Sequence, residues 1–391
     1  MKKNGCCKIA GLVLAAGSAE RMGECKALMP LPRDSALEVI VTRMRAAGVS
    51  SVTVVTGGYE ETVRRESLRL DCDTAFNPAY RSGMFSSVLT GIRAIGDGTD
   101  AFFLLPVDVP LVKPPTYRAM IDAFIEGYDA PEVVYPTFSG ERGHPPLIGR
   151  EMTGRILAWG GEGGLRGLLA LSEKSLDVPT ADRAVLLDMD TQDDYRALLS
   201  YRMGEKIPDD GECEELLSIA GTPKKVTRHM KVVEGCAGRL ADALSKSGVS
   251  AKIDRRLLRS ACLLHDIAKG KKDHEARGAA WLRERGYSKV AGLVASHKDL
   301  GGKALKSSSI SEAELLYLSD KITDGEVILT LKNRMLRMET RFAPGSEALA
   351  AATRKIKQAS GIQKKIEKLT GRKLAELLAD VGSQAGGEDY I

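Results

Sequence analysis

The sequence lacks several features that would assign it to a class at once. None of its apolar runs approaches the roughly 20 residues that a membrane span requires, so we expect no membrane partner. Its seven cysteines are scattered and include no C-x-x-C pair, which is typical of reduced thiols and not of a disulfide framework. The basic start leads into an apolar stretch that ends at a glycine-containing loop, so we interpret it as a first strand and not as a secretory signal. These absences predict a cytoplasmic protein.

Two familiar nucleotide-binding patterns are absent as well. Neither the G-x-G-x-x-G fingerprint of dinucleotide-binding folds nor the G-K-[ST] end of a Walker loop occurs. The net charge is only +5, and we expect no nucleic-acid partner. The first ~203 residues carry a net charge of about −3 and the remainder about +8. This asymmetry fits a C-terminal half that meets phosphates, although a solvated basic surface produces the same asymmetry.

The chain of 391 residues is too long for a single hydrophobic core, and its pattern changes near residue 204. Before that point strand-like and helix-like stretches alternate, which predicts an α/β, Rossmann-like fold with a mostly parallel sheet and helices on both faces. A polar stretch with proline and glycine follows, and a nearly all-helical pattern comes after it. We therefore predict a domain at 1–203, a linker at 204–222 and an all-α domain at 223–391.

The expected elements follow from these patterns. Strands are expected at 8–14, 51–56, 73–76, 101–107, 132–136 and 184–189, with helices at 35–47, 60–70, 84–95, 115–125 and 192–201. Residues 346–381 predict two or three amphipathic helices. Because ligands in such α/β folds bind at the carboxyl ends of strands, the loops behind the strands are the first places to search for a site.

A glycine-containing loop follows the first expected strand. It reads L-A-A-G-S-A-E-R-M-G-E-C-K from Leu14 to Lys26. Its backbone N–H groups can approach a phosphate closely because Gly17 and Gly23 tolerate positive φ. Arg21 and Lys26 add charge that can neutralise a triphosphate. Taken alone, the segment also fits an ordinary turn between a strand and a helix.

Polar side chains follow other expected strands. Asp108 ends the apolar run A-F-F-L-L-P-V-D-V, where a charge has no role in the core, so it suggests a Mg²⁺ ligand. The loop N-P-A-Y-R-S-G-M-F-S-S enters a helix with Ser86 and Ser87 near its N-terminus, which can bind a base, a ribose or an anion. Asp190 in D-M-D-T offers a second carboxylate to the metal, and Asp188 is a neighbouring candidate.

Together these segments resemble the nucleotidyltransferases of molybdenum cofactor biosynthesis, and most closely the molybdenum cofactor cytidylyltransferases. The resemblance covers residues 8–203. It is carried by L-A-A-G-x-x-x-R-M-G-x-x-K, the N-P…S-S loop, D-V-P, G-x-R-G-H-P, G-G-E-G-G-L-R and D-M-D-T-Q-D-D. The family's guanylyl-transferring branch typically has a second glycine where this chain has Ala16, so the alanine leans towards CTP.

The resemblance implies that the terminal phosphate of molybdopterin attacks the α-phosphorus of CTP and releases pyrophosphate. It implies that Asp108 and Asp190 hold Mg²⁺, that Arg21 and Lys26 steady the triphosphate, and that molybdenum hydroxylase apoenzymes are partners. His144 either touches the pterin side or is a structural residue of its turn. The residues implied in nucleotide binding are Leu14, Ala15, Ala16, Gly17, Arg21, Lys26, Ser86 and Ser87, and those implied in catalysis are Arg21, Lys26 and Asp108.

Histidine is scarce, and four of the five histidines fall after residue 228: His229, His265, His274 and His297. Each alone would pass for a surface residue or a satisfied core residue. Their concentration, with Asp266 directly after His265 behind an apolar stretch, indicates a metal site. Imidazole and carboxylate ligands suit Zn, Mn, Fe or Ni, and a helical bundle can bring distant positions together. Asp320 follows an apolar helical face and is the expected final ligand.

This H…HD…D pattern resembles the HD superfamily of metal-dependent phosphohydrolases, over residues 223–323. The resemblance implies four core ligands, which are His229, His265, Asp266 and Asp320. It places His274 and His297 where the two-metal branch of the superfamily has additional ligands, and that branch often holds two iron or manganese ions. Lys269 could contact a phosphate in catalysis.

The sequence thus predicts a bifunctional enzyme, in which a cytidylyltransferase for a molybdopterin-type acceptor is joined to a metal-dependent phosphohydrolase whose substrate stays open. Two alternatives fit the same residues. The N-terminal half can be a cytidylyltransferase for a sugar or polyol phosphate. The C-terminal half can be a nucleotide-sensing regulatory module without turnover.

Overall fold

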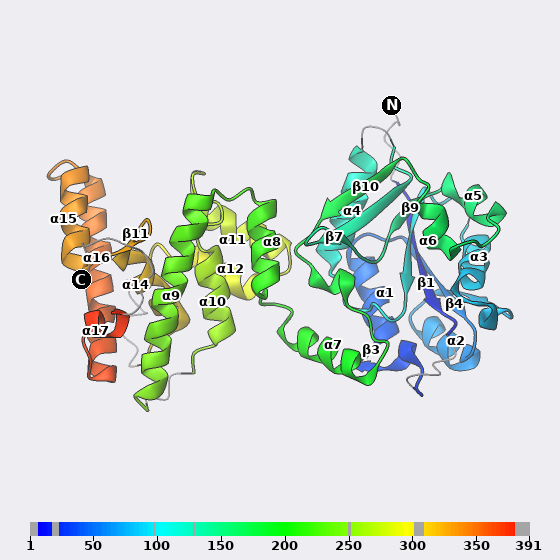
Figure 1. Cartoon of the computed structure of the whole chain (residues 1–391), viewed down its shortest axis with the longest axis horizontal. Coiled ribbons are helices and arrows are strands. Elements are labelled where there is room, and N and C mark those ends of the chain that lie inside the picture. The colour runs from blue at the N-terminus through cyan, green and yellow to red at the C-terminus, as the bar shows by residue number, and fades with distance from the viewer. Residues whose placement is uncertain are drawn as a thin grey trace. The chain divides into compact units, whose positions relative to one another are not determined.

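The computed structural model describes residues 7–17, 23–96, 98–127, 130–248, 252–300 and 309–379. The chain divides into two compact units, Met1–Glu205 and Lys206–Ile391, which run from blue to green and from green to red in Figure 1. No helix within these described ranges is both long and apolar enough to cross a membrane.

The described part of the first unit is built on an eight-stranded sheet with the order β10-β7-β9-β6-β1-β4-β5, and β8 pairs with β7. Its strands are β1 (Ile9–Ala15), β4 (Ser51–Thr56), β5 (Asp73–Phe76), β6 (Ala101–Pro106), β7 (Val133–Phe138), β8 (Glu141–Arg142), β9 (Leu147–Gly149) and β10 (Ser175–Pro179). A separate hairpin joins β2 (Pro30–Leu31) to β3 (Asp34–Ser35). Strand β1 runs parallel to β4 and β6, whereas β9 runs antiparallel to β6 and β7. This confirms the mostly parallel sheet that the sequence predicts.

Helices cover both faces of this sheet because side chains on a strand alternate between its faces. On β1, Ile9 and Val13 pack into one apolar cluster, and Leu12 and Leu14 pack into another on the opposite face. The first cluster includes residues of α1, α2 and α4, and the second includes residues of α3, α5 and α6. These helices, and the last one of the unit, are α1 (Ala36–Ala46), α2 (Glu60–Arg69), α3 (Met84–Ala94), α4 (Pro114–Glu126), α5 (Met152–Ala158), α6 (Gly164–Leu169) and α7 (Gln192–Gly204).

One expected strand is wrong. Residues 184–189 do not join the sheet, and Arg183–Leu186 form a short 3₁₀ helix instead. The buried carboxylate of Asp182 starts this turn by accepting a hydrogen bond from the backbone N–H of Ala184, at 3.3 Å. The backbone carbonyl of Val185 accepts from the N–H of His144, at 2.8 Å. The short apolar run therefore packs as a turn, and the far edge of the sheet is completed by β10, which the sequence pattern did not reveal.

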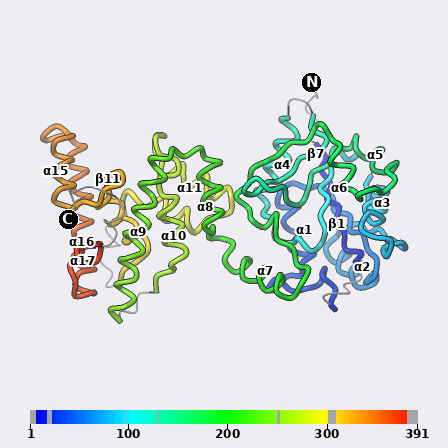
Figure 2. The backbone as a smooth tube through the Cα atoms, in the orientation of Figure 1, coloured from blue at the N-terminus to red at the C-terminus, as the bar shows by residue number. Residues whose placement is uncertain are grey.

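The described part of the second unit is mostly helical, as predicted, with one two-residue hairpin of β11 (Thr323–Asp324) and β12 (Val327–Ile328). Its helices are α8 (Asp210–Ile219), α9 (Lys224–Lys246), α10 (Arg255–Leu264), α11 (His274–Glu284), α12 (Ser288–Ser296), α14 (Glu312–Ile322), α15 (Leu331–Arg341), α16 (Glu347–Thr370) and α17 (Leu374–Leu378). The tube in Figure 2 follows the chain through this bundle. Helix α9 packs against α10, α14 and α16, and α14 also packs against α15 and α16.

Helix α8 lies inside the segment that the sequence predicts as a linker. Asp209 and Glu212 form a capping box, in which each side chain accepts a hydrogen bond from the backbone N–H of the other residue. Such a box satisfies two backbone donors that a helix start otherwise leaves unpaired. The buried side chains of Leu216 and Cys213 explain why the helix packs on the bundle rather than spanning solvent.

We expect Asp209→Ala to lower the free energy of unfolding by about 1 kcal/mol, because the cap of α8 is lost. Glu214→Ala, at an exposed position of the same helix, is the matched control and should stay within about 0.5 kcal/mol. Urea unfolding of both full-length variants measures the difference. Equal stability of the two variants would mean that the Asp209 cap contributes nothing measurable to the stability of the second unit.

Candidate active sites

The first site lies where β1 and β6 end at the same edge of the sheet. Lys26 begins a short 3₁₀ helix after the loop behind β1, Asp108 follows β6, and Asp190 precedes α7. The Nζ atom of Lys26 lies 2.7 Å from Oδ1 of Asp190 and 3.5 Å from Oδ2 of Asp108. The backbone N–H of Met189 donates to the carbonyl of Asp108, at 3.0 Å, which ties the two acidic segments together. Residues far apart in the sequence therefore meet here as expected.

The charge around this edge is concentrated on the carboxylates. Burial raises the pKa of the Asp188 carboxyl, and the charges of Asp190 and Asp108 raise that pKa further. Burial lowers the pKa of His144, although Asp108 and Asp188 act in the opposite direction. Three carboxylates within electrostatic reach of one another favour a bound cation, because an ion relieves their repulsion. Lys26 supplies one positive charge, and carboxylate oxygens are the ligands that Mg²⁺ prefers.

The predicted phosphate loop is described only in part. Leu14 and Ala15 end β1, Ala16 is buried and Gly17 is exposed. Arg21, which the sequence predicts to bind the triphosphate, lies outside the described residues.

Ala16 is packed against a glycine of the neighbouring segment. Its carbonyl accepts a hydrogen bond from the N–H of Gly58, at 3.1 Å. A Cβ atom placed on Gly57 would come within 2.4 Å of that carbonyl oxygen, so only glycine permits this close approach. The backbone behind β1 is thereby held by the loop behind β4.

The second predicted nucleotide-binding segment is organised by a buried asparagine. The Nδ2 group of Asn77 donates to the hydroxyls of Ser86 and Ser87, at 2.8 and 2.9 Å. Ser86 also hydrogen-bonds the carbonyls of Ala79 and Gly83. Ser87 is buried and Ser86 is only partly exposed. In this structure the two hydroxyls therefore hold the loop that precedes α3, and their binding to a nucleotide stays a prediction.

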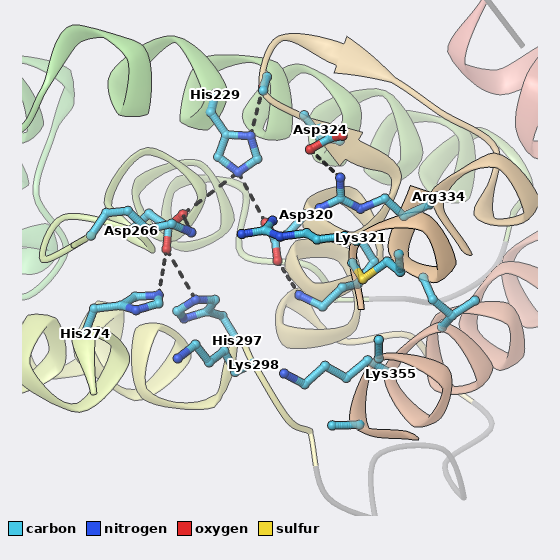
Figure 3. A pocket seen from close by; sticks show the side chains of 18 of the residues that line it. His229, Asp266, His274, His297, Lys298, Asp320, Lys321, Asp324, Arg334 and Lys355 are labelled. Carbon is cyan, nitrogen blue, oxygen red and sulfur yellow. Dashed lines mark hydrogen bonds and ion pairs between the residues drawn. The ribbon is translucent and has the colours of Figure 1, made fainter. Parts of the chain in front are cut away.

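The second site gathers the ligands that the sequence predicts for the C-terminal half. Figure 3 shows five of the six side chains converging from several helices of the bundle. His229 comes from α9, His274 begins α11, and Asp320 lies near the end of α14. The His265–Asp266 pair follows α10, and His297 follows α12. The ligand atoms form two groups: His229, His265 and Asp320 in one, and Asp266, His274 and His297 in the other.

Asp266 reaches both groups. Its Oδ1 atom lies 3.0 Å from Nε2 of His274 and 3.6 Å from Nε2 of His297. Its Oδ2 atom lies 3.6 Å from Nε2 of His265 and 4.0 Å from Nε2 of His229. One carboxylate thus turns one oxygen towards each group, which is the arrangement expected of a ligand shared by two metal ions.

The histidines are oriented by backbone carbonyls. Nδ1 of His229 lies 2.9 Å from the carbonyl oxygen of Gly325. Nδ1 of His265 lies 2.9 Å from the carbonyl oxygen of Cys262, and Nδ1 of His297 lies 2.7 Å from that of Val294. A carbonyl can only accept, so each Nδ1 must carry the proton. Each Nε2 is then turned towards the centre of the cluster, where that of His229 lies 3.2 Å from Oδ1 of Asp320. A neutral ring can offer this Nε2 to a cation, and a carbonyl at Nδ1 is the usual outer support of a metal-binding histidine.

The buried polar atoms of this cluster fit metal ions. Nε2 of His265, Oδ1 of Asp266 and Nε2 of His274 are buried without a hydrogen-bond partner among the described residues. Leaving such atoms unpaired is costly, and a bound cation removes the cost. Burial alone would raise the pKa of Asp266, but His274, His297 and the charges of His265 and Lys269 outweigh it and lower that pKa. The carboxylate therefore stays ionised.

Asp320 behaves in the same way. Burial would raise its pKa, but the charge of Lys321 and the neighbouring imidazoles of His229 and His265 lower it well below the ordinary value. Lys269, predicted to contact a phosphate, lies with its Nζ 2.7 Å from Oδ2 of Asp266. It is half-exposed, so it lies at the edge of the cluster where an incoming anion would meet it.

A cavity of about 590 Å³ opens beside the cluster. Its lining includes five of the six proposed ligands, all except His265. It also includes residues in or next to α15 and α16 that the sequence analysis did not single out, among them Arg334, Met338, Phe342 and Lys355. The amphipathic periodicity of residues 346–381 predicts α16 but not α15, and it does not tell which lysine or arginine of a basic chain faces a cavity.

Comparison with known families identifies one domain in each half of the chain. Residues 11–178 match the family described as MobA-like NTP transferase domain, and residues 226–324 match the HD domain. The chain therefore joins a nucleotidyltransferase domain to an HD domain.

Individual relatives match the N-terminal half. The molybdenum cofactor cytidylyltransferase of Escherichia coli K12 is 24% identical over 187 residues, which are 47% of this chain and 92% of that protein. The bifunctional protein GlmU of Xanthobacter autotrophicus is 33% identical over 108 residues, which are 27% of this chain and only 24% of that protein. The crystal structure of Rv0371c from Mycobacterium tuberculosis H37Rv superimposes with a TM-score of 0.45 at 27% identity, over 50% of this chain and 99% of that chain.

Proposed function

Because the chain joins a MobA-like NTP transferase domain to an HD domain, we propose that it is a bifunctional enzyme. The N-terminal half transfers a cytidylyl group from CTP to a molybdopterin-type acceptor. The C-terminal half hydrolyses a phosphate ester or anhydride. The proposed acceptor is supported by the 24% identity to the molybdenum cofactor cytidylyltransferase, which extends over 92% of that relative. Molybdenum hydroxylase apoenzymes are the proposed recipients of the product.

The convergence of Lys26, Asp108 and Asp190 carries the proposal for the N-terminal half. In the reaction, an oxygen of the acceptor's terminal phosphate forms a bond to the α-phosphorus of CTP. The bond from that phosphorus to the bridging oxygen breaks, and pyrophosphate leaves with the electron pair. Such chemistry needs mostly positioning and charge neutralisation from the protein.

Each residue of this edge has a role in that scheme. Asp108 and Asp190 hold Mg²⁺, which when bound supplies charge neutralisation at the triphosphate. Lys26 turns from the two carboxylates to the phosphates as the nucleotide enters. Arg21 adds a second positive charge to the triphosphate. Leu14, Ala15, Ala16 and Gly17 present the backbone on which the nucleotide rests, and the Asn77 network keeps Ser86 and Ser87 in place beside it.

We expect CTP to be preferred over GTP by about 10-fold or more in kcat/KM, a difference of about 1.4 kcal/mol. Ala16 is buried and packed against Gly57, so it holds the backbone after β1 on which the base is proposed to rest. Ala16→Gly should reduce the preference, because a more flexible residue there lets this backbone move. The measurement is initial-rate transfer to molybdopterin with each nucleotide.

The control for this prediction is Ala94→Gly, the same chemical change at an exposed position of α3, which should keep the preference of the wild type. Sugar and polyol phosphates are included as acceptors in the same assay. A clear preference for GTP contradicts the nucleotide assignment, and faster transfer to a sugar or polyol phosphate contradicts the molybdopterin-type acceptor.

The two ligand groups that share Asp266 carry the proposal for the C-terminal half. Iron or manganese ions fit the mixed histidine and carboxylate set. Such ions supply charge stabilisation at the phosphoryl group and an activated nucleophile when bound. Hydrolysis consumes one water, whose oxygen bonds to phosphorus while the bond to the leaving oxygen breaks. The oriented histidines keep the ligand atoms in place, and Lys269 draws the anionic substrate towards them.

Metal analysis together with a phosphatase screen tests the C-terminal activity. The full-length protein, reconstituted with Fe, Mn, Zn or Ni, should hold two ions per chain at the histidines and cleave at least one member of a nucleotide and phosphoester panel. Two bound ions without any turnover would favour the nucleotide-sensing alternative.

A further inference from the structure

The cavity beside the histidine cluster is walled on one side by helices that lie beyond the matched HD region. That region ends at residue 324, whereas α15 and α16 span Leu331–Arg341 and Glu347–Thr370. Both helices contribute lining residues to the same cavity of about 590 Å³ that exposes the metal-ligand cluster. The part of the cavity away from the cluster is therefore shaped by helices outside the matched HD region.

The wall is anchored to the helix that carries a ligand. Tyr317 is buried in α14, and its Oη lies 2.9 Å from Oε1 of Gln358 and 3.2 Å from the carbonyl of Lys355, both in α16. Glu314, also buried in α14, pairs with Lys365 of α16 at 2.8 Å. Since Asp320 lies on the same helix α14, these contacts fix the wall at a constant position relative to the ligands.

The cavity carries more positive than negative charge. Seven of its lining residues are lysine or arginine and three are aspartate, and two of those aspartates, Asp266 and Asp320, are the proposed metal ligands. Bound metal ions would make the excess of positive charge larger still. Four of the seven cations are paired with carboxylates, and the remaining excess of positive charge favours an anionic ligand.

Three ammonium groups of the cavity lining come from different helices or from the turn after one. Figure 3 shows Lys298, Lys321 and Lys355 pointing into the cavity from three different segments. Burial lowers the pKa of Lys355, and the charges of Lys321 and Lys298 lower it further, whereas those of Asp299 and Glu275 act in the opposite direction. Lys298 pairs with Glu275 and Lys321 with Asp320, but Lys355 pairs with no carboxylate within the described ranges. Lys355 is therefore available to an anion.

The same wall is apolar beside the lysines. Met338 of α15, Phe342 directly after α15, and Ala352 and Ile356 of α16 line the cavity. The small alanine side chain leaves room, and Met338 and Phe342 offer the surfaces on which a planar ring packs well. An inorganic phosphate chain would gain nothing from this face, because it has no apolar surface to bury.

We infer that α15 and α16 form a substrate-recognition wall, and that the hydrolysed substrate is a nucleotide-type organic phosphate with at least two phosphate groups. One phosphate lies at the metal-ligand cluster. A second one is bound by Lys355 together with Lys298 and Lys321, and the ring packs against Met338 and Phe342. The inference rests on the proposed phosphohydrolase activity and names the substrate class of that site.

Lys355→Met tests the anion subsite in the full-length, metal-loaded protein. With a nucleoside triphosphate as substrate, its KM should rise by about 10-fold or more with kcat nearly unchanged, since a charge-assisted contact made before the reaction is lost. Hydrolysis of bis(p-nitrophenyl) phosphate, which has a single phosphate, should change less than about twofold. Lys357→Met is the matched control, because Lys357 is exposed on α16 and does not line the cavity.

Phe342→Ala tests the ring subsite. In this variant the ratio of kcat/KM for the nucleoside triphosphate to kcat/KM for inorganic tripolyphosphate should fall. Lys355→Met should instead lower kcat/KM for both substrates. If wild-type protein cleaves tripolyphosphate as efficiently as the nucleotide, or if Lys355→Met and Lys357→Met share one KM, the recognition wall is refuted while the phosphohydrolase activity stands.

Calorimetry separates failure of the inference from failure of the proposed activity. A methylene-bridged nucleoside triphosphate should occupy two sites per chain, one in each half, and Lys355→Met should remove or weaken only one of them. This result upholds the wall even when no substrate is cleaved. A single site per chain that Lys355→Met does not alter refutes the wall whatever the turnover.

Discussion

Asp266→Ala is expected to strip both metal ions from the C-terminal half and to reduce phosphate hydrolysis by about 10³-fold or more. Asp266 turns Oδ1 towards His274 and His297 and Oδ2 towards His265 and His229. Its loss therefore takes a ligand from both groups at once. Metal content by mass spectrometry and hydrolysis of the best substrate of the panel are the two measurements.

Two further variants make this prediction specific. His274 belongs to one ligand group only, so His274→Ala should lose mainly one ion. Asp242→Ala, a half-exposed carboxylate on α9, should keep both ions and full hydrolysis. Cytidylyl transfer by the same preparations should be unaffected, and circular dichroism checks that the helices are retained. If Asp266→Ala binds two ions, or if His274→Ala loses both, the shared-ligand assignment is incorrect.

The ligand set of the second unit could be predicted from the sequence because its residue types are rare. Five histidines occur in the whole chain, and the four that fall late lie within one cluster of side chains. The family resemblance already set His274 and His297 apart from the four core ligands, but the distances that join Asp266 to both groups depend on how α9, α11, α12 and α14 pack. The carbonyl of Gly325, which orients His229, carries no sequence signal at all.

The sequence was less informative about segments whose structure is decided by a few local hydrogen bonds. The apolar run at 184–189 resembles a strand, but Asp182 starts a turn there. The polar residues after 204 suggest a linker, although Asp209 and Glu212 stand at the spacing of a capping box, a signal that would have revealed α8. In both segments the hydrogen bonds of an acidic N-cap residue decide the local structure, although the composition around it suggests a different one.

The contacts of individual lysines could not be predicted from the sequence either, because they depend on how distant segments pack. Lys26 follows a recognisable loop, so its place at the first site could be predicted, but its pairing with Asp190 and Asp108 depends on three segments meeting. Lys355 is one of many basic residues in a helix whose amphipathic pattern shows only that one face is buried. Its place in the cavity depends on Tyr317 and Glu314, which hold α16 against α14.

Asp108→Ala is expected to reduce kcat for cytidylyl transfer by about 10³-fold or more, which corresponds to about 4 kcal/mol in the barrier. Asp108 lies just after the end of β6, and its Oδ2 atom is 3.5 Å from Nζ of Lys26. Without it, Asp190 alone faces Lys26 at 2.7 Å, and the pair of carboxylates that favours Mg²⁺ is broken. Raising the Mg²⁺ concentration should restore part of the rate, because the loss is one of metal affinity as well as of charge placement.

The matched control is Asp122→Ala, an exposed carboxylate on α4, which should transfer at the wild-type rate. Asp190→Ala should be damaging too, and comparison with Asp188→Ala decides which of the two neighbours is the second ligand. Phosphate hydrolysis by the second unit, measured on the same Asp108→Ala preparation, should be unchanged, since its ligands come from another unit. Near-normal transfer by Asp108→Ala at low Mg²⁺ would exclude Asp108 as the principal ligand. The negative charges around Lys26 and His144 would then serve to position these two groups and not to hold a metal ion.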